Sequence, residues 1–155
     1  YSDGQFSYAI AYYLDGGELK LAEEILDFYV IDTVPLSHDV GLLAGVRIAD
    51  PLKFGMNVVT ANGSQAAPAF EGYTYINSQP LGDGRAVVLF LKGDQYPFPE
   101  AGSWLATVMI TDGESADILA TLSTPIVPSS VALWRNDLYL GISDGSVWRS
   151  EGVAP

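Results

Sequence analysis

The stretch GRAVVLFLK, from Gly84 to Lys92, decides the fold class, because its apolar residues form a continuous run. Successive side chains of a strand point to opposite faces of the sheet, so a strand without alternation is buried on both faces. Turn-forming residues bound the stretch, with LGDG before it and KGDQYPFPEAG after it. We therefore predict that it is a central strand of a packed sheet.

Other segments alternate apolar and polar residues, which is the pattern of strands that bury one face. The first is QFSYAIAYYL (5–14), and the clearest is SWLATVMIT (103–111), which runs into the turn DGE. Only ELKLAEEILDF (18–28) has apolar residues at helical spacing, so we expect at most one short helix. Further strands are expected at 25–32, 41–48, 56–61, 70–77 and 117–123.

The C-terminal stretch VALWRNDLYLGISDGSVWRS (131–150) predicts a three-stranded β-meander. Its strands are VALWR, LYLGIS and SVWRS, and the dipeptides Asn136–Asp137 and Asp144–Gly145 suit tight turns between them. The preceding STPIVPSS (123–130) holds two prolines and is interpreted as a linker. We predict an all-β antiparallel β-sandwich over 1–127, then a linker and the meander over 128–155 as an appendage that is not an independent domain.

Composition narrows the classes of partner. The 155 residues include 19 acidic and 7 basic side chains, which gives a formal net charge of −12, and no cysteine. An acidic surface repels nucleic-acid phosphates and anionic lipids, so we expect no nucleic acid and no membrane insertion. The lack of cysteine excludes disulfides and thiolate metal sites. Because the sequence starts at Tyr1 rather than Met, we expect a processed mature protein or an excised domain.

The acidic turn DGESAD (112–117) is a candidate metal site. Asp112, Glu114 and Asp117 offer the oxygen ligands that calcium prefers, although solvated turn acids are the alternative. Calcium is the only cofactor that the sequence suggests.

His38 is the only histidine, and Asp39 follows it. Neighbours on an extended chain point to opposite faces, so we expect Asp39 to be badly placed to orient His38. The sequence has no GxSxG elbow, and turn carboxylates lack the burial that a glycosidase needs. We therefore expect no catalytic residues and no enzymatic activity.

Aromatic residues are more numerous than a small core needs, with nine Tyr, three Trp and six Phe. Exposed aromatics anchor protein interfaces or stack on sugar rings, and use in the core is the alternative. The sequence NGS at 62–64 makes Asn62 a candidate N-glycosylation site. The interface candidates are Tyr8, Tyr12, Trp134, Tyr139 and Trp148.

The order of turns and strands from about Tyr8 to Val127 carries a family resemblance. A first strand runs into LDGGELKLA (14–22), and DGRAVVLFLKGDQYPFPEAGSWLATVMITDGESADILATLSTPIV (83–127) holds a strand, a loop with prolines, a long alternating strand and a closing strand. This order resembles the N-terminal immunoglobulin-like domain of bacteriophage baseplate upper proteins. The resemblance implies an immunoglobulin-like sandwich that organises virion attachment hardware.

Three functions follow as expectations. The first is a non-enzymatic structural or attachment protein of a virion, in a phage tail, baseplate or fibre, that contacts copies of itself or other structural proteins. The second is a secreted prokaryotic surface or filament subunit, in which strand 6–14 is added to the sheet of the next subunit. The third is a carbohydrate-binding module for a cell-surface glycan. The expected location is accordingly a virion, the cell surface or the extracellular space.

Overall fold

The computed structural model describes residues 8–15, 17–48, 52–60, 62–93, 95–96 and 104–153, and of residues 8–15, 19, 21–26 and 95–96 it describes the backbone only. Apart from one 3-10 turn, η1 (Pro68–Phe70), all regular structure in these ranges is β-strand. The strands are β1 (Tyr8–Asp15), β2 (Glu18–Leu26), β3 (Phe28–Pro35), β4 (Val40–Arg47), β5 (Leu52–Thr60), β6 (Gly63–Ala66), β7 (Tyr73–Pro80), β8 (Ala86–Lys92), β9 (Gln95–Tyr96), β10 (Trp104–Thr111), β11 (Ala116–Thr124), β12 (Pro128–Trp134), β13 (Asp137–Ile142) and β14 (Val147–Ser150).

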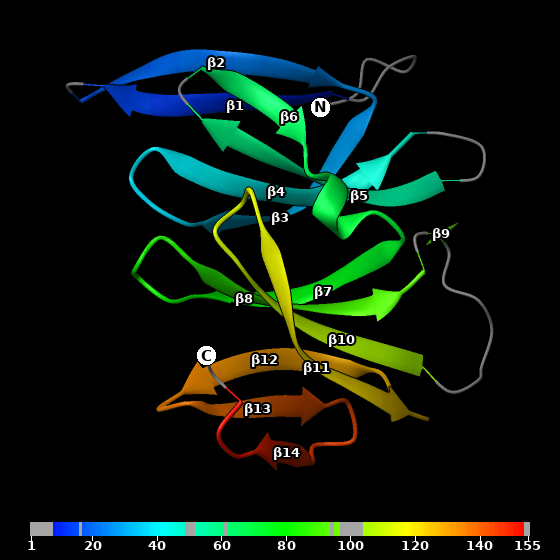
Figure 1. Cartoon of the computed structure of the whole chain (residues 1–155). Helices are drawn as coiled ribbons and strands as arrows, with labels where there is room; N and C mark the ends of the chain where they lie inside the picture. Colours follow the sequence, from blue (N-terminus) through cyan, green and yellow to red (C-terminus); the bar gives the residue numbers. More distant parts are fainter. Residues whose placement is uncertain are drawn as a thin grey trace.

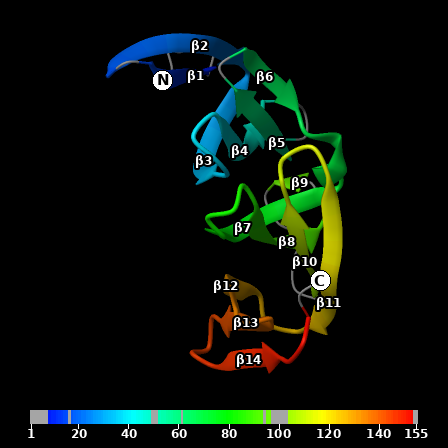
Figure 2. The same ribbon diagram turned by 60° about the vertical axis from the view of Figure 1, so that its left-hand side comes forward.

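The strands form antiparallel sheets that are stacked one above another (Figure 1). The first sheet has the order β3-β4-β5-β6, with β9 beside β5, and the central sheet has the order β11-β10-β8-β7. The meander β12-β13-β14 lies on the far side of the central sheet. Figure 2 shows the same stack from another side, with the hairpin β1–β2 at one end and β14 at the other. The predicted all-β antiparallel sandwich with a C-terminal three-stranded meander is confirmed.

The connections within each sheet join strands that are neighbours in sequence, apart from the short β9 between β8 and β10. In an immunoglobulin domain the chain passes back and forth between the two sheets. The likeness to an immunoglobulin sandwich is therefore one of layered architecture rather than of strand order.

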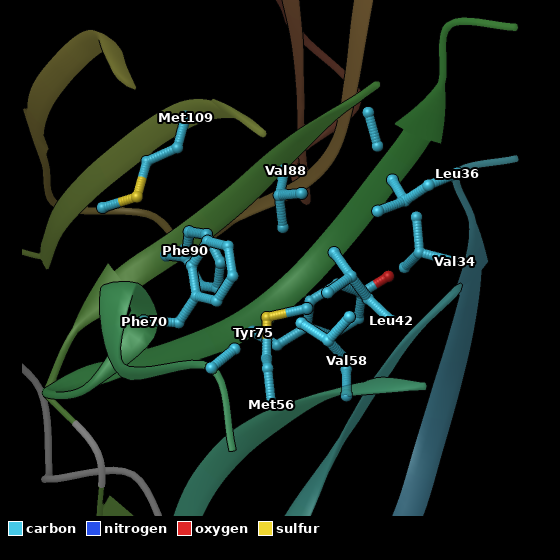
Figure 3. Packing of buried hydrophobic residues seen from close by; sticks show 13 residues of the cluster. Val34, Leu36, Leu42, Met56, Val58, Phe70, Tyr75, Val88, Phe90 and Met109 are labelled. Atoms are coloured by element: carbon cyan, nitrogen blue, oxygen red, sulfur yellow. The ribbon is translucent and has the colours of Figure 1, made fainter. Parts of the chain in front are cut away.

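Strand β8 is buried on both faces, as the run of apolar residues predicts. Phe90 and Val88 belong to the core between the central sheet and the first sheet, which also contains Phe70 of η1 (Figure 3). The rings of Phe70 and Phe90 stack with their centroids 5.2 Å apart. Leu89 has the opposite orientation and belongs to the core shared with the meander. Burying a side chain of this size stabilises the fold by about 1.5–3 kcal/mol.

The meander contributes an apolar face to this second core. Along β13 buried residues alternate with partly exposed ones, and the buried set is Leu138, Leu140 and Ile142. Strand β12 adds Val131, and these side chains pack in one core with residues of the central sheet such as Val108 of β10. The central sheet is therefore covered on both faces, which explains why Thr107, on the predicted polar face of β10, is buried.

The segment 18–28 is not helical, which agrees with the prediction of at most one short helix and settles the segment as strand. Residues Glu18–Leu26 form β2, which pairs antiparallel with β1, and Phe28 begins β3. A strand with a β-bulge keeps apolar residues on one face despite irregular spacing, and β2 has such a bulge at Ala22.

The C-terminal turns differ in detail from the prediction. Strand β12 begins at Pro128, so the expected linker over 123–130 shrinks to the three residues between β11 and β12. The first turn centres on Arg135 and Asn136, both at positive φ, rather than on Asn136 and Asp137. The second is wider than a two-residue turn, because the Ile142 amide donates to the Ser146 carbonyl at 2.9 Å.

Candidate protein-interaction surface

The meander is held on the central sheet by two amide side chains of β7. The Asn77 Oδ1 atom accepts a hydrogen bond from the Val131 N–H at 3.1 Å, and the Gln79 Oε1 atom accepts one from the Leu133 N–H at 2.7 Å. These hydrogen bonds satisfy backbone N–H groups along the edge of β12. Without them, those N–H groups would be free to pair with a strand of another molecule. The two bonds fix the position of the meander as well as closing one of its edges.

The outer face of the meander carries aromatic and basic side chains. Because Leu138 and Leu140 face the core, Tyr139 between them faces outward. Cross-strand pairing places Trp134, Val147 and Arg149 on the same outer face. We call Trp134, Arg135, Tyr139, Val147 and Arg149 the meander patch. Trp134 is 59% exposed and Val147 is 66% exposed, so the outer face presents two large apolar side chains to solvent.

Arginine side chains pack against both aromatic rings of the meander patch. The Arg135 Cζ atom lies 4.5 Å from the ring centroid of Trp134, and the Arg149 Cζ atom lies 6.0 Å from that of Tyr139. Each contact has the geometry of a cation–π interaction, worth about 0.5–1 kcal/mol at an exposed site. The stacking limits the rotamers of these side chains before any partner arrives.

A hydrogen-bond network fixes Arg149 further. Its Nη2 atom donates to the Asp137 Oδ2 atom at 2.6 Å and lies 3.3 Å from the Glu151 carboxylate. The hydrogen bonds from Arg149, with a smaller effect of the Gly152 N–H, lower the pKa of Asp137 below its ordinary value. Asp137 therefore stays ionised and holds the guanidinium in place at neutral pH.

The other predicted interface residues are placed differently. Trp148 pairs with Leu140, so it is on the core-facing side of β14, yet it is 46% exposed, as is typical of β14, whose four residues are all exposed. Tyr8 and Tyr12 are in β1, and their side chains lie outside the described part of the structure. Asn62 is exposed in the hairpin between β5 and β6, where its N–H donates to the Thr60 hydroxyl at 3.2 Å.

The candidate calcium ligands are not brought together. The Asp112 Oδ1 atom accepts hydrogen bonds from the N–H groups of Glu114 and Ser115 at 3.0 and 2.8 Å, and this lowers the pKa of Asp112. Its carboxylate therefore closes the turn, and Asp117 lies on β11. Across the described ranges, no three acidic or histidine side chains are grouped so that they could hold a metal ion.

The expectation for His38 was wrong in one respect. Residues 36–39 form a turn rather than an extended strand, because the N–H groups of Leu36 and Ser37 both donate to the Val40 carbonyl. The turn brings the His38 Nδ1 atom to 2.8 Å from the Asp39 Oδ1 atom. Both side chains are more than three-quarters exposed, without the enclosure that a catalytic pair needs.

A second exposed apolar surface was missed by the sequence analysis. Tyr29 and Ile31 of β3 are 61% and 51% exposed, and Ile48, just after β4, is 47% exposed. The Ile48 N–H donates to the Asp27 carbonyl at 2.8 Å, which sets Ile48 beside the start of β3. We call Asp27, Tyr29, Ile31 and Ile48 the β3 patch. The sequence does contain a signal for this surface, the uninterrupted apolar run FYVI (28–31). Because β3 is at an edge of its sheet, part of that run is exposed to solvent.

The edges of the three larger sheets are blunted against further strand pairing. Extra residues interrupt the ladders of the edge strands β3, β7, β11 and β12, and the remaining edges, β6 and β14, are four residues long. Bulges and short strands are the devices by which proteins prevent edge-to-edge pairing. The bulged residues are Ile31, Ile76, Leu119 and Ser129.

No protein-family model matches the chain, and no curated protein matches its sequence. In the part of the chain that the structure describes, no helix is long and apolar enough to cross a membrane.

Proposed function

We propose that this chain is a non-enzymatic structural or attachment module that acts through protein–protein contacts, with the meander patch as its contact surface. The observation that carries the proposal is that exposed Trp134, half-buried Tyr139 and two exposed arginines share the outer face of a meander that is fixed to the central sheet. Trp, Tyr and Arg are the side chains that most often dominate the binding energy of protein interfaces.

The stiffness of the surface favours this function. Arg135 and Arg149 are already stacked on aromatic rings, and Arg149 is also bonded to Asp137. Binding therefore immobilises fewer free rotamers, each of which opposes association by about 0.5–1.5 kcal/mol. The resemblance to phage baseplate upper proteins over 8–127 supports a virion as the setting, and a secreted cell-surface protein is the alternative setting.

Contact through side chains is favoured over assembly by strand addition. The N-terminal strand β1, which strand addition would donate to a neighbour, pairs with β2 of its own chain. The bulged and short edge strands offer a poor template for an incoming strand.

The test is the assembly state of the purified protein, measured by mass photometry and sedimentation from nanomolar to high micromolar concentration. We expect concentration-dependent association that Trp134→Ser abolishes. The control is Ile118→Ser on β11, since Ile118 is also 59% exposed but lies away from the meander. A wild-type chain that is monomeric at every concentration would contradict self-assembly, and equal effects of the two substitutions would contradict the choice of surface.

Carbohydrate binding is the second candidate, favoured by the exposed indole of Trp148. A flat aromatic ring can stack on a sugar. A glycan array decides between the two candidates: glycan binding that is lost in Trp148→Ala, with no self-association at any concentration, would replace the first proposal.

A further inference from the structure

Two exposed apolar surfaces lie on different layers of the stack. The β3 patch belongs to the first sheet, and the meander patch belongs to the outermost sheet at the other end, with the central sheet between them. Both expose large apolar side chains, led by Tyr29 and Trp134. Because the central sheet lies between them, the two surfaces cannot contact each other within one copy of the chain.

The two patches differ in charge. Residues 128–155 hold two arginines, Arg135 and Arg149, and three acidic residues, so this segment is close to neutral. The other 127 residues hold sixteen acidic and five basic residues. The β3 patch begins at the exposed Asp27, whereas the meander patch has Arg135 at the tip of its hairpin. In a chain of net charge −12, this nearly neutral segment is the part that a second copy repels least, and Arg135 adds a positive charge to it, whereas Arg149 is ion-paired with Asp137 and Glu151.

We infer that copies of this chain associate head to tail, with the meander patch of one copy docked on the β3 patch of the next. This inference rests on the proposed function and specifies the partner and the geometry of the contact. Trp134 and Arg135 meet Tyr29, Ile48 and Asp27 of the second copy, so that apolar surface is covered and opposite charges face each other. Pairing of two β3 patches would set Asp27 against Asp27, which is unfavourable.

Contact between two different surfaces has a structural consequence. A heterologous interface leaves one free patch at each end of a growing oligomer, so it produces open chains or closed rings rather than dimers alone. This behaviour suits a component of an extended assembly, and it separates the inference from symmetric pairing of two meanders.

The test uses two variants that each remove one end of the contact, Trp134→Ser and Tyr29→Ser. The wild-type chain is expected to form dimers, trimers and longer species by mass photometry, and each variant alone is expected to be monomeric. A mixture of the two variants retains one intact pair of patches, Trp134 of the Tyr29→Ser chain and Tyr29 of the Trp134→Ser chain. The mixture is therefore expected to form dimers and nothing larger. Circular dichroism and thermal unfolding check that each variant is folded.

The possible failures are distinguishable. If Tyr29→Ser assembles like the wild type while Trp134→Ser does not, head-to-tail docking is overturned and the proposed function stands. If the wild-type chain never associates, head-to-tail docking and self-assembly through the meander patch are both overturned. A mixture that stays monomeric also overturns head-to-tail docking. The charge argument is tested by Arg135→Gln, which should weaken association and its dependence on salt, with Arg85→Gln, an exposed arginine elsewhere, as the control.

Discussion

The Gln79 Oε1 atom accepts a hydrogen bond from the backbone N–H of Leu133 at 2.7 Å, so a side chain of β7 takes the place of a neighbouring strand at the edge of β12. Asn77, two residues earlier on the same face of β7, does the same for Val131. The bonds join residues that are 54 positions apart in the sequence. Together they close an edge of the meander and hold it against the central sheet.

Replacing Gln79 by Met keeps the length of the side chain and removes the acceptor. We expect the free energy of unfolding to fall by about 1–3 kcal/mol, because the Leu133 N–H is left without its partner. Hydrogen exchange of the Leu133 amide should accelerate more than that of the β8 amides, which change only as far as the global free energy of unfolding falls. The control is Gln65→Met on the exposed strand β6. Unchanged exchange at Leu133 would contradict the role of Gln79.

The raised pKa of Tyr75 predicts that the folded protein loses stability at alkaline pH. Its hydroxyl donates to the Asp32 carboxylate of β3 and lies 3.0 Å from the Ser78 hydroxyl. Burial, and then the hydrogen bond to Asp32, raise the pKa of Tyr75 well above its ordinary value of 10.0. The folded state therefore keeps a proton that the unfolded chain releases above pH 10, and the stabilisation that is complete at neutral pH is lost as the pH rises through the raised pKa.

The variant Tyr75→Phe tests this linkage. At neutral pH it should be less stable than the wild type by about 1–3 kcal/mol, since a hydrogen bond to a charged group is removed. Above pH 10 the difference should shrink, because only the wild type still has this tyrosine to titrate. Urea unfolding across the alkaline range measures it. A gap that stays constant with pH would show that Tyr75 is not linked to folding in this way.

Gly45 in β4 is required by close packing. A Cβ atom at this position would lie 2.3 Å from the Tyr29 carbonyl oxygen and 2.7 Å from the Phe28 ring. We expect Gly45→Ala to lower the free energy of unfolding by about 1–3 kcal/mol or more, because β3 must move. Gly41→Ala on the same strand is the matched control, since its Cβ atom would be 3.7 Å from the nearest atom. Similar melting temperatures for the two variants would contradict this account.

Structural features that depend on a short stretch of residues could be predicted from the sequence. Features that depend on residues far apart in the chain could not. The two-sided burial of β8 could be read from six consecutive apolar residues, Ala86 to Leu91. The secondary structure of residues 18–28 could not be read in this way, because their apolar spacing fits a helix and a bulged strand equally. Pairing with β1 decides between the two.

Prediction of the interaction surface from the sequence is limited for the same reason. Whether Trp134 or Leu133 faces outward depends on the register of β12 against β13, which is set by the turn at Arg135 and Asn136. The dipeptide pattern placed that turn one residue too late. Likewise, Asn77 and Gln79 look like ordinary strand residues until the edge of β12 is placed beside them.

Leu89 tests whether the meander belongs to the folded core. It is fully buried in the core that the central sheet shares with the meander. Leu89→Ala should therefore lower the free energy of unfolding by about 2–5 kcal/mol, as expected for a leucine in a closed core. Leu105→Ala on the neighbouring strand β10 is the control, because Leu105 is 36% exposed and its loss should have a small effect. Chemical unfolding should show one transition for Leu89→Ala, shifted as a whole, because the meander has no other core of its own. If the two substitutions had equally small effects, the meander would be only loosely attached, and it could not hold the meander patch in a fixed position for a partner.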